Sequence, residues 1–512
     1  MINRDKTEAI PLTQRASTRF NLQEYGQAPF GQQFTHLGVK LQQGGRDMAA
    51  IEKEILDGLR RTVATWNKRR LHFTGRVNVA NTYMLSKIWH VAPFYDFSSA
   101  FFTDLDRITK TLLWDGNARV SLAWFRRPKS RGGWGLLDPK TQCAALKAKW
   151  LARWRVENPK WSDLFVTAAK DFYGHRDDMV TRTFLQVPPK AKAAWVPRGG
   201  SPTIVSMATK AFASLDVKRL PAQEVCNRRE KGADTTFGSK GLTVNFFTVR
   251  EARRTMDQQL LEAKIKKPRP QAPSNWAPIF ANMRLYDVFW PREGDLLPLP
   301  AYPDKIWSKF YERLHAPERH VHEKDFLYML AHNVIYTNGI KGHFGYDKNK
   351  EIGVGCRRCK AERPEEEPPV ETRMHAFYSC PSVYQLWETV RGWLAELFPT
   401  TFLSTHPHMT VLGWPDTPKL ESLAVHIHSV ASHAVWVTHC KLGDDEKLAT
   451  NELQRYALNA LRYRGRIEWE RALHRDRLEA ERATASTTGD RRVPDTAYKA
   501  MKEKWHYPPL IV

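Results

Sequence analysis

The residues best suited to chemistry in this chain are three cysteines and one histidine that lie close together in the sequence. Cys356 and Cys359 form a C-x2-C pair, and fifteen residues later His375 and Cys380 form an H-x4-C pair. Zn²⁺ prefers four thiolate or imidazole ligands in a tetrahedron, and a C-x2-C turn supplies two of them. Since four protein ligands leave no open position for water, the spacing predicts a structural rather than a catalytic zinc site.

Two other interpretations of this cluster stay open at the level of sequence. The C-x2-C pair could be coincidental, beside an ordinary buried cysteine and histidine, or it could be a redox motif. A redox motif is disfavoured because no βαβ pattern surrounds it, and 6 cysteines in 512 residues do not make a disulfide framework. If metal is bound, Arg357 and Arg358 between the two cysteines would help to offset the negative charge of the thiolates.

Other patterns that could support catalysis are incomplete. Segment 238–241 (GSKG) lacks the spacing of a phosphate-binding loop or a nucleophile elbow, and segment 132–135 (GGWG) is not a dinucleotide fingerprint. His322-Glu323 has no second histidine four positions after the first, and Asp444-Asp445 is typical of a helix N-cap. The motifs therefore predict that the chain is not an enzyme.

The chain carries a large positive charge. Its 79 lysines and arginines against 55 aspartates and glutamates give a formal net charge of +24, and its pI is near 9.7. Such a surface attracts polyanions because neutralised phosphates release their counterions, so we expect RNA, DNA or both as partners. The alternative is a positive surface that is merely solvated.

Three basic clusters are the expected phosphate contacts. The first follows Trp66, the second follows Trp124, and the third lies in a proline-rich segment. Since none of them has the context of a recognition helix, we expect contacts to the backbone without base choice. Both tryptophans could instead be core anchors whose basic neighbours simply face water. The cluster residues are Lys68, Arg69 and Arg70; Arg126, Arg127, Lys129 and Arg131; and Lys266, Lys267 and Arg269.

Hydrophobic periodicity predicts the elements that position these residues. Apolar residues recur at helical spacing over 47–68, over a second stretch that ends before Pro93, and over a third that closes at 115–117. Three consecutive helices joined by short turns predict a small bundle, and a further helix is expected over 141–155. The other predicted elements are strands at 34–41 and 241–249 and helices around 306–310, 326–334, 420–442 and 444–483.

The expected fold class is mainly α, with minor β. It comprises a helical bundle, an irregular middle region, and a helical C-terminal region that holds the zinc knuckle of three cysteines and one histidine. The H-x4-C pair is expected at the start of a helix that continues through Leu386 and Trp387. Eight prolines between Pro268 and Pro303 argue against long helices in that part of the middle region.

Several short segments outside the zinc motif follow one another in a distinctive order. They are Asn3-Arg4-Asp5-Lys6-Thr7-Glu8; His36-Leu37-Gly38-Val39; Gly75-Arg76; Leu112-Leu113-Trp114 with Trp124; Arg127-Pro128-Lys129 with Gly132-Gly133-Trp134-Gly135-Leu136; and Ala144-Ala145-Leu146 with Lys149-Trp150. Over residues 1–155 and 306–390, these segments and the C-x2-C…H-x4-C motif resemble the C-terminal half of the reverse transcriptase of LINE-type (non-LTR) retrotransposons, including its zinc-binding domain.

The resemblance implies a domain organisation and a mode of binding. In the related polymerases the thumb lies along the primer–template duplex, so the first two basic clusters resemble elements that grip the nucleic-acid backbone. The implied parts are a remnant of the palm and primer-grip hairpin (1–46), a thumb-like helical bundle with the post-thumb segment (47–157), an irregular, proline-rich basic region (158–303), the zinc-binding domain (304–400), C-terminal helices (401–483) and a loosely ordered tail (484–512).

One departure from the family decides the expected activity. These polymerases carry a Y-x-D-D loop and an earlier aspartate, because two Mg²⁺ ions need paired carboxylates. Here Tyr95-Asp96 and Tyr286-Asp287 are single, and no Y-x-D-D occurs. We therefore expect a truncated reading frame, whose Met1 is an internal methionine of a longer ancestor, and a protein that binds nucleic acid without catalysis. The alternative is part of an active RNA-directed DNA polymerase whose catalytic half lies upstream or in another chain.

Hydropathy and the N-terminus bear on location. The mean hydropathy is −0.54, and no uncharged apolar run reaches the roughly 20 residues that a membrane span needs. The first six residues contain no apolar signal region. We expect an intracellular protein of the nucleus or cytoplasm, without a membrane partner and with other retrotransposon proteins as further candidate partners.

Overall fold

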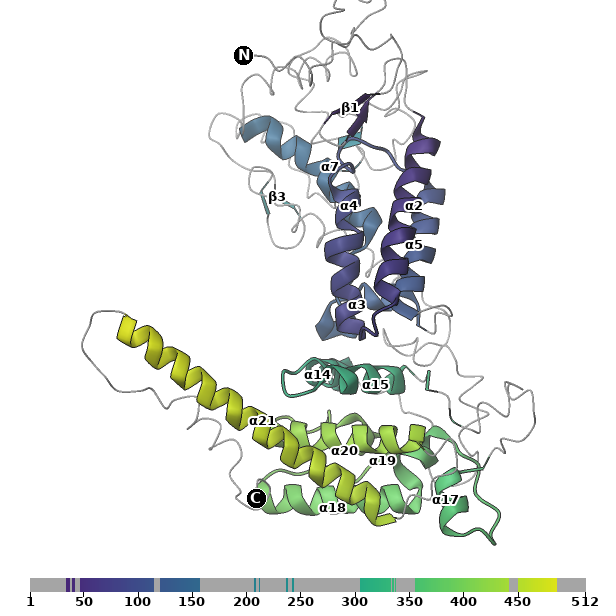
Figure 1. Cartoon of the computed structure of the whole chain (residues 1–512), viewed down its shortest axis with the longest axis vertical. Helices are drawn as coiled ribbons and strands as arrows, with labels where there is room; N and C mark the ends of the chain where they lie inside the picture. The colour runs from purple at the N-terminus through teal and green to yellow at the C-terminus, as the bar shows by residue number, and fades with distance from the viewer. Residues whose placement is uncertain are drawn as a thin grey trace, which may run out of the picture. The chain divides into compact units, whose positions relative to one another are not determined.

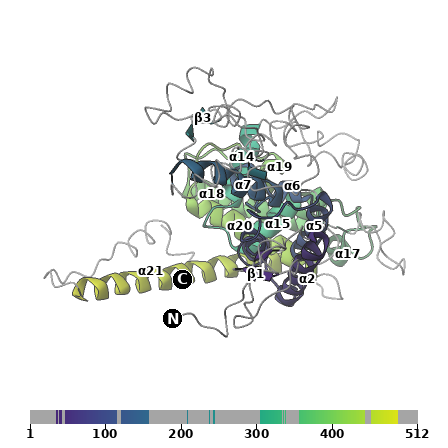
Figure 2. The ribbon, with the colours of Figure 1, turned by 90° about the horizontal axis from the view of Figure 1, so that it is seen from above.

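The structure is a computed structural model, and its described part is mostly helical with almost no strands (Figures 1 and 2). This agrees with the predicted mainly α class. The described residues are 34–36, 39–41, 47–114, 120–156, 207–208, 211, 236–237, 242–243, 304–332, 334–335, 337, 355–441 and 450–485. The chain divides into two compact units, the first made of 1–71, 75–118 and 136–269 and the second of 72–74, 119–135 and 270–512.

The first unit is built around two long amphipathic helices. Helix α2, Met48–Asn67, begins at the N-cap Asp47, whose side chain accepts a hydrogen bond from the Ala50 backbone N–H at 3.0 Å. It packs against α5, Ser99–Trp114. The two helices bury one apolar side chain per turn at their interface, which is the periodicity that predicted them. These buried residues include Ile51, Leu56, Leu59 and Val63 of α2 and Phe101, Leu105, Ile108, Leu112 and Leu113 of α5.

The second predicted helix is interrupted by a wider turn. It consists of α3, Phe73–Val79, a π-helical turn η3, Ala80–Met84, and α4, Ser86–Trp89. Within the wide turn, the Leu85 N–H bonds to the Ala80 carbonyl at 2.8 Å, five residues back. Sequence periodicity predicted a continuous helix because Val77, Asn81, Met84 and Ile88 keep a spacing of three or four residues across the wide turn.

Two further parts of the first unit were predicted in outline. Helix α7, Pro139–Val156, covers the predicted helix. The hairpin of β1, Phe34–His36, and β2, Val39–Leu41, lies in the predicted strand region. A second antiparallel pair joins β3, Thr236–Phe237, to β4, Leu242–Thr243, so the predicted strand at 241–249 is described at two residues only.

The second unit is a layered group of helices. Helix α20, Ser422–Lys441, lies between α15, Val321–Ala331, and α18, Pro381–Leu397, and the long helix α21, Thr450–Ala485, packs across α20 and α18 (Figure 1). Both views show α21 extending well past the end of α20 (Figures 1 and 2). Among the described residues, the other helices of this unit are α6, Leu122–Phe125; η4, Lys129–Arg131; α14, Asp304–Leu314; α17, Arg357–Glu362; η8, His375–Ser379; and α19, Pro407–Leu412.

Residues 119–135 belong to this second unit by their contacts. Residues 119–135 pack with α14 and α15, although the sequence grouped them with residues 47–157. Trp134 bonds back to the Phe125 carbonyl through its backbone N–H at 3.1 Å, and its ring centroid lies 5.2 Å from that of Tyr328. At Gly133, an added Cβ would lie 1.8 Å from the Arg127 carbonyl oxygen, so only glycine fits this turn.

Candidate metal centre

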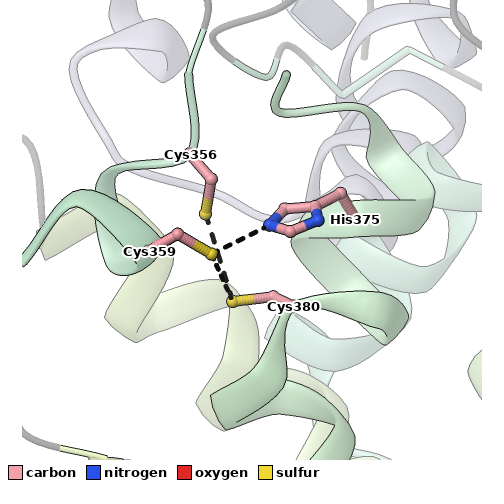
Figure 3. Close-up of side chains that lie close together, drawn as sticks. All are labelled: Cys356, Cys359, His375 and Cys380. Atoms are coloured by element: carbon pink, nitrogen blue, oxygen red, sulfur yellow. Dashed lines mark hydrogen bonds between the residues drawn. The ribbon is translucent and has the colours of Figure 1, made fainter. Parts of the chain in front are cut away.

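The four residues predicted to bind metal point toward one another in the second unit (Figure 3). Cys356 Sγ lies 4.0 Å from Cys380 Sγ, Cys359 Sγ lies 3.9 Å from Cys380 Sγ, and Cys359 Sγ lies 3.3 Å from His375 Nε2. All four ligand atoms lie within 4.8 Å of one another. His375 therefore faces the thiols, as the four-ligand prediction requires.

The C-x2-C half of the site is held by a short backbone pairing and a helix start. Gly355 forms an isolated antiparallel bridge with Val370, and the Cys356 N–H donates to the Pro369 carbonyl at 2.8 Å. Cys356 is then the N-cap of α17. Since Cys359 follows in the first turn of this helix, both sulfur atoms emerge on one side.

The H-x4-C half differs from the prediction of a single helix. His375 begins a π-helical turn, η8, His375–Ser379, while Cys380 is the N-cap of α18. The Cys380 N–H bonds to the His375 carbonyl at 2.8 Å, which fixes the two ligands relative to each other. Pro381 occupies the first turn of α18, where a missing N–H costs nothing.

The spacing of the ligand atoms fits a tetrahedral zinc ion. With Zn–S near 2.3 Å and Zn–N near 2.0–2.1 Å, tetrahedral ligands lie about 3.8 Å apart for two sulfurs and about 3.6 Å apart for sulfur and nitrogen. The Cys356–Cys380, Cys359–Cys380 and Cys359–His375 distances of 4.0, 3.9 and 3.3 Å bracket these values, and all four ligand atoms lie within 4.8 Å of one another. Three thiolates and one imidazole also form a donor set that zinc prefers.

The protonation of the three thiols is uneven. The Cys356 thiol donates to Cys380, and this hydrogen bond, together with His375, lowers the pKa of Cys380 to about 4. The same hydrogen bond and burial raise the pKa of Cys356. Burial, followed by the nearby Cys380 charge, raises the pKa of Cys359 to about 11. A metal ion that binds all three sulfurs as thiolates must therefore displace protons from Cys356 and Cys359.

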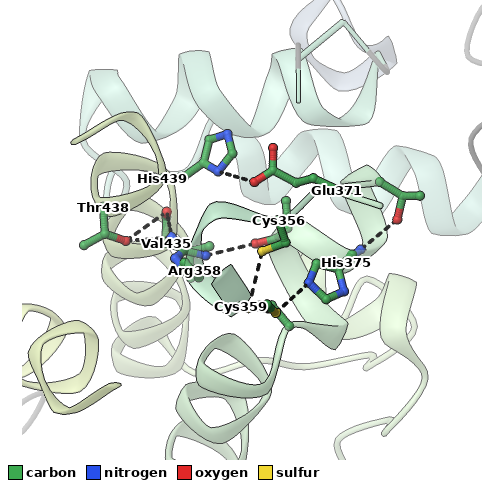
Figure 4. Close-up of polar contacts among 11 residues, drawn as sticks. Cys356, Arg358, Cys359, Glu371, His375, Val435, Thr438 and His439 are labelled. Carbon is green, nitrogen blue, oxygen red and sulfur yellow. Dashed lines mark hydrogen bonds and ion pairs between the residues drawn. The ribbon is translucent and has the colours of Figure 1, made fainter. Parts of the chain in front are cut away.

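A buried arginine connects the C-x2-C turn to helix α20 (Figure 4). Arg358 donates through Nη2 to the Val435 carbonyl at 2.7 Å and to Thr438 Oγ1 at 2.8 Å, and through Nη1 to the Ala376 carbonyl at 3.2 Å. Burial lowers the pKa of Arg358, and the neighbouring thiols oppose that shift. Sequence analysis predicted a charge role for this residue but missed its bonds to α20, because nothing local indicates a partner so far along the chain.

An ion pair lies on the same side of the site. His439 Nδ1 of α20 lies 3.5 Å from Glu371 Oε1, and the Glu371 side chain is only 2% exposed (Figure 4). Glu371 precedes His375 by four residues, so this contact anchors the segment that leads into the second pair of ligands. The sequence carried no signal for either residue.

The first basic cluster is exposed in the first unit. Lys68, Arg69 and Arg70 directly follow α2 and all three are exposed. The Arg69 guanidinium lies 4.6 Å from the centroid of the Trp66 ring, and Trp66 itself is only half-buried. This cluster is accessible, as a phosphate-contacting surface must be.

The second basic cluster is divided between surface and core. Lys129 and Arg131 are exposed in the second unit, and Arg126 is half-buried. Arg127 packs over the ring of Trp124 at 3.7 Å, and burial lowers its pKa. Because Trp124 is only 3% exposed, it is the core anchor that one interpretation of the sequence anticipated. Lys266, Lys267 and Arg269 lie outside the described residues.

Comparison with known protein families and with curated proteins finds no match for this sequence. None of the helices among the described residues is long and apolar enough to cross a membrane.

Proposed function

We propose that this protein binds nucleic acid through the phosphate backbone, without sequence choice and without catalysis, and that a structural zinc ion organises its second unit. The observation that carries the proposal is the convergence of Cys356, Cys359, His375 and Cys380 in a chain of formal net charge +24. The resemblance to the zinc-binding part of a LINE-type reverse transcriptase supports the same conclusion.

Zinc is proposed as the metal because it prefers thiolate and imidazole ligands and because four protein ligands leave no open coordination position. A bound zinc ion would be held by the three sulfurs and the imidazole, and it would supply folding free energy rather than a reactive water. Its ligands come from the start of α17, from η8 and from the N-cap of α18, so the site joins three short backbone segments.

Phosphate contacts are assigned to the exposed members of the basic clusters. These are Lys68, Arg69 and Arg70 in the first unit and Lys129 and Arg131 in the second. Flexible basic side chains next to helix ends and turns make point-charge contacts, which position a nucleic acid without reading its bases. The duplex between template and primer is the proposed ligand class, and either RNA or DNA satisfies this chemistry.

The absence of catalysis is proposed from the sequence alone. The chain contains no Y-x-D-D, so it lacks the paired carboxylates that two Mg²⁺ ions require for phosphoryl transfer. The alternative is a chain that works with a catalytic half supplied by another polypeptide. Purified protein incubated with primer, RNA template and Mg²⁺ or Mn²⁺ should then show no extension, whereas chelator-sensitive extension would contradict the proposal.

Fluorescence anisotropy tests the binding proposal directly. Zinc-loaded protein is titrated with labelled DNA duplexes and DNA–RNA hybrids of unrelated sequence at several salt concentrations. We expect Kd values that agree within about threefold across sequences and a log–log salt slope near −0.9 for each phosphate contact on duplex DNA. No binding at low salt, or a strong preference for one sequence, would overturn the proposal and favour a protein-interaction role.

A further inference from the structure

Four histidines gather on the second unit, away from the metal centre. They come from three places: His72 from segment 72–74, His320 and His322 from the start of α15, and His433 from α20. The His322 ring centroid lies 3.8 Å from that of His72, 5.0 Å from that of His320 and 6.0 Å from that of His433. We call these four residues the histidine cluster.

The histidine cluster does not have the geometry of a metal site. Among the described residues, only the cysteine and histidine group of the metal centre brings three or more ligand atoms together. The rings of His320 and His322 are instead stacked, with an angle of 16° between their planes. Both side chains are exposed to solvent, and the His320 ring also takes part in the capping box with Glu323 that begins α15.

The charged groups around the histidine cluster are mostly cationic. Arg464 and Arg471 of α21 are near enough to His320 to lower its pKa, in addition to the larger effect of burial and the effect of His322. Arg471 is exposed, whereas Arg464 is ion-paired with the buried Glu323.

The carboxylates near the histidine cluster are already engaged. Glu323 also accepts hydrogen bonds from the His320 N–H, at 2.8 Å, and from the Ser429 hydroxyl. Asp325 accepts from the Phe73 N–H at 3.1 Å and lies 3.3 Å from His72 Nδ1. Glu468 of α21 is paired with His426 at 2.9 Å. Since these carboxylates already have partners, the surface carries an excess of positive charge when the imidazoles are protonated.

We infer that the histidine cluster, with Arg471 beside it, is a phosphate-contacting surface that makes the affinity for nucleic acid rise as the pH falls. This inference rests on the proposed function. It adds a site at which nucleic acid is contacted, and it adds pH as a variable that regulates the affinity. A phosphate group near the exposed imidazoles favours their charged forms, so binding takes up protons. The inner member, His433, has its pKa lowered to about 4 by burial and by His322 and His320, so it stays neutral over this pH range.

The sign of the pH effect follows from linkage. If binding takes up one proton, affinity changes by at most about tenfold per pH unit between the pKa of the free and bound forms. Between pH 7.5 and 5.5 we expect Kd for a 20-base-pair DNA duplex to fall about tenfold at constant ionic strength. The salt slope should become steeper by about 0.9 over the same range, as one further phosphate contact requires.

Variants of the exposed pair separate this inference from its alternatives. His322→Gln and the double variant with His320→Gln should change their affinity less than twofold over that pH range, whereas the wild type changes about tenfold. Because His320 is also the N-cap of α15, replacing it can weaken that helix. The single variant His322→Gln leaves the N-cap in place and therefore controls for a folding effect. His322→Arg should bind at pH 7.5 with an affinity near that of the wild type at pH 5.5. His474→Gln, at an exposed histidine of α21 outside the cluster, is the matched control and should leave the pH profile unchanged.

The outcomes distinguish two failures. If wild-type protein binds the duplex but its pH profile is the same in His322→Gln, the histidine cluster is not the responsive surface and this inference is overturned alone. If wild-type protein does not bind at any pH, both this inference and the proposed function are overturned. Zinc content measured at each pH ensures that metal loss is not the cause of any change.

Discussion

Arg358 and Val435 are joined by a 2.7 Å hydrogen bond from a guanidinium to a backbone carbonyl, across 77 positions of sequence. Arg358 lies between the two cysteines of the C-x2-C turn, and Val435 lies in the middle of α20. Arg358, whose two cysteine neighbours belong to the candidate metal site, therefore also holds α20. The stability of the metal centre and the packing of α20 should consequently be coupled.

Replacing this arginine tests the coupling. Arg358→Met removes the charge but keeps an apolar side chain, and it leaves the Val435 and Ala376 carbonyls without this donor. Lost hydrogen bonds from a buried charged group cost about 2–4 kcal/mol of unfolding free energy. Urea unfolding of the zinc-loaded protein measures the loss. Lys360→Met, at an exposed position of the same helix, should change the unfolding free energy by less than about 0.5 kcal/mol. Equal effects of the two substitutions would refute the coupling.

Removal of the metal ligands should show a single structural zinc site. Wild-type protein is expected to hold about one zinc ion per chain, and Cys356→Ser, Cys359→Ser or His375→Ala to hold close to none after gel filtration, because a three-ligand site loses the closed tetrahedron. Elemental analysis measures the content, and circular dichroism reports the accompanying unfolding of α17. Cys440→Ser, which changes an exposed cysteine of α20, should keep full zinc content. Retention of zinc in all three ligand variants would exclude the proposed site.

The metal centre was the part of the molecule most fully predictable from sequence. Its four ligands lie within two short segments, so spacing alone indicated that they could converge. The amphipathic helices α2 and α5 were predictable for a similar reason, since each buries one face at a regular period. The π-helical turns at Ala80–Met84 and His375–Ser379 were not predictable, because a hydrophobic pattern of three- and four-residue steps does not distinguish a five-residue turn from a regular one.

Close backbone contact makes Gly133 the glycine of residues 119–135 that is most sensitive to substitution. A Cβ at this position would lie 1.8 Å from the Arg127 carbonyl oxygen, and backbone atoms cannot move aside without rebuilding the turn. Gly133→Ala should therefore lower the unfolding free energy by at least about 3 kcal/mol. Gly392→Ala in α18 meets nothing within 4 Å and should be neutral or stabilising by up to about 1 kcal/mol. Thermal melts of the two variants provide the measurement, and a stable Gly133→Ala protein would contradict the geometry.

The roles of the basic residues could not be separated from sequence alone. Arg69 and Arg127 each lie three residues after a tryptophan, and both guanidiniums pack on that ring. Yet Arg69 is exposed, whereas Arg127 is half-buried against the core around Tyr311 and Tyr328, both of which raise its pKa against the effect of burial. Long-range packing decides the difference, and no local pattern encodes it.

This difference predicts that substitutions in the first cluster alter binding, whereas substitution of Arg127 alters stability. Arg69→Gln with Arg70→Gln should flatten the salt slope of DNA binding by about 1.8, or about 0.9 per lost contact, with little change in stability. Arg127→Gln should instead lower the melting temperature, because it removes a cation–π contact from a packed site. Anisotropy and thermal melts on the same samples separate the two effects. An unchanged slope in the Arg69 and Arg70 variant would remove that cluster from the binding surface.

Acid should destabilise the second unit through a buried histidine. His332 is 5% exposed, and burial, followed by the charge of Arg127, lowers its pKa from 6.5 to about 3. In the unfolded chain this imidazole binds a proton below about pH 6.5, whereas the folded protein keeps it neutral until about pH 3. The unfolded state therefore gains protons first, and the unfolding free energy falls as the pH drops through this window.

The expected size of this effect is about 3 kcal/mol between pH 7 and pH 4, at about 1.4 kcal/mol per pH unit below the unfolded pKa. The neutral ring also lies 3.2 Å from the Tyr311 hydroxyl, a contact that protonation alters, so the loss should be specific to this site. His332→Gln can keep a hydrogen bond to Tyr311 but cannot titrate, so its stability should fall less steeply over the same range. Urea unfolding from pH 7 to pH 4 compares the slopes, with the exposed His474→Gln as control. Parallel curves for wild type and His332→Gln would show that acid acts elsewhere, on the thiols or the carboxylates.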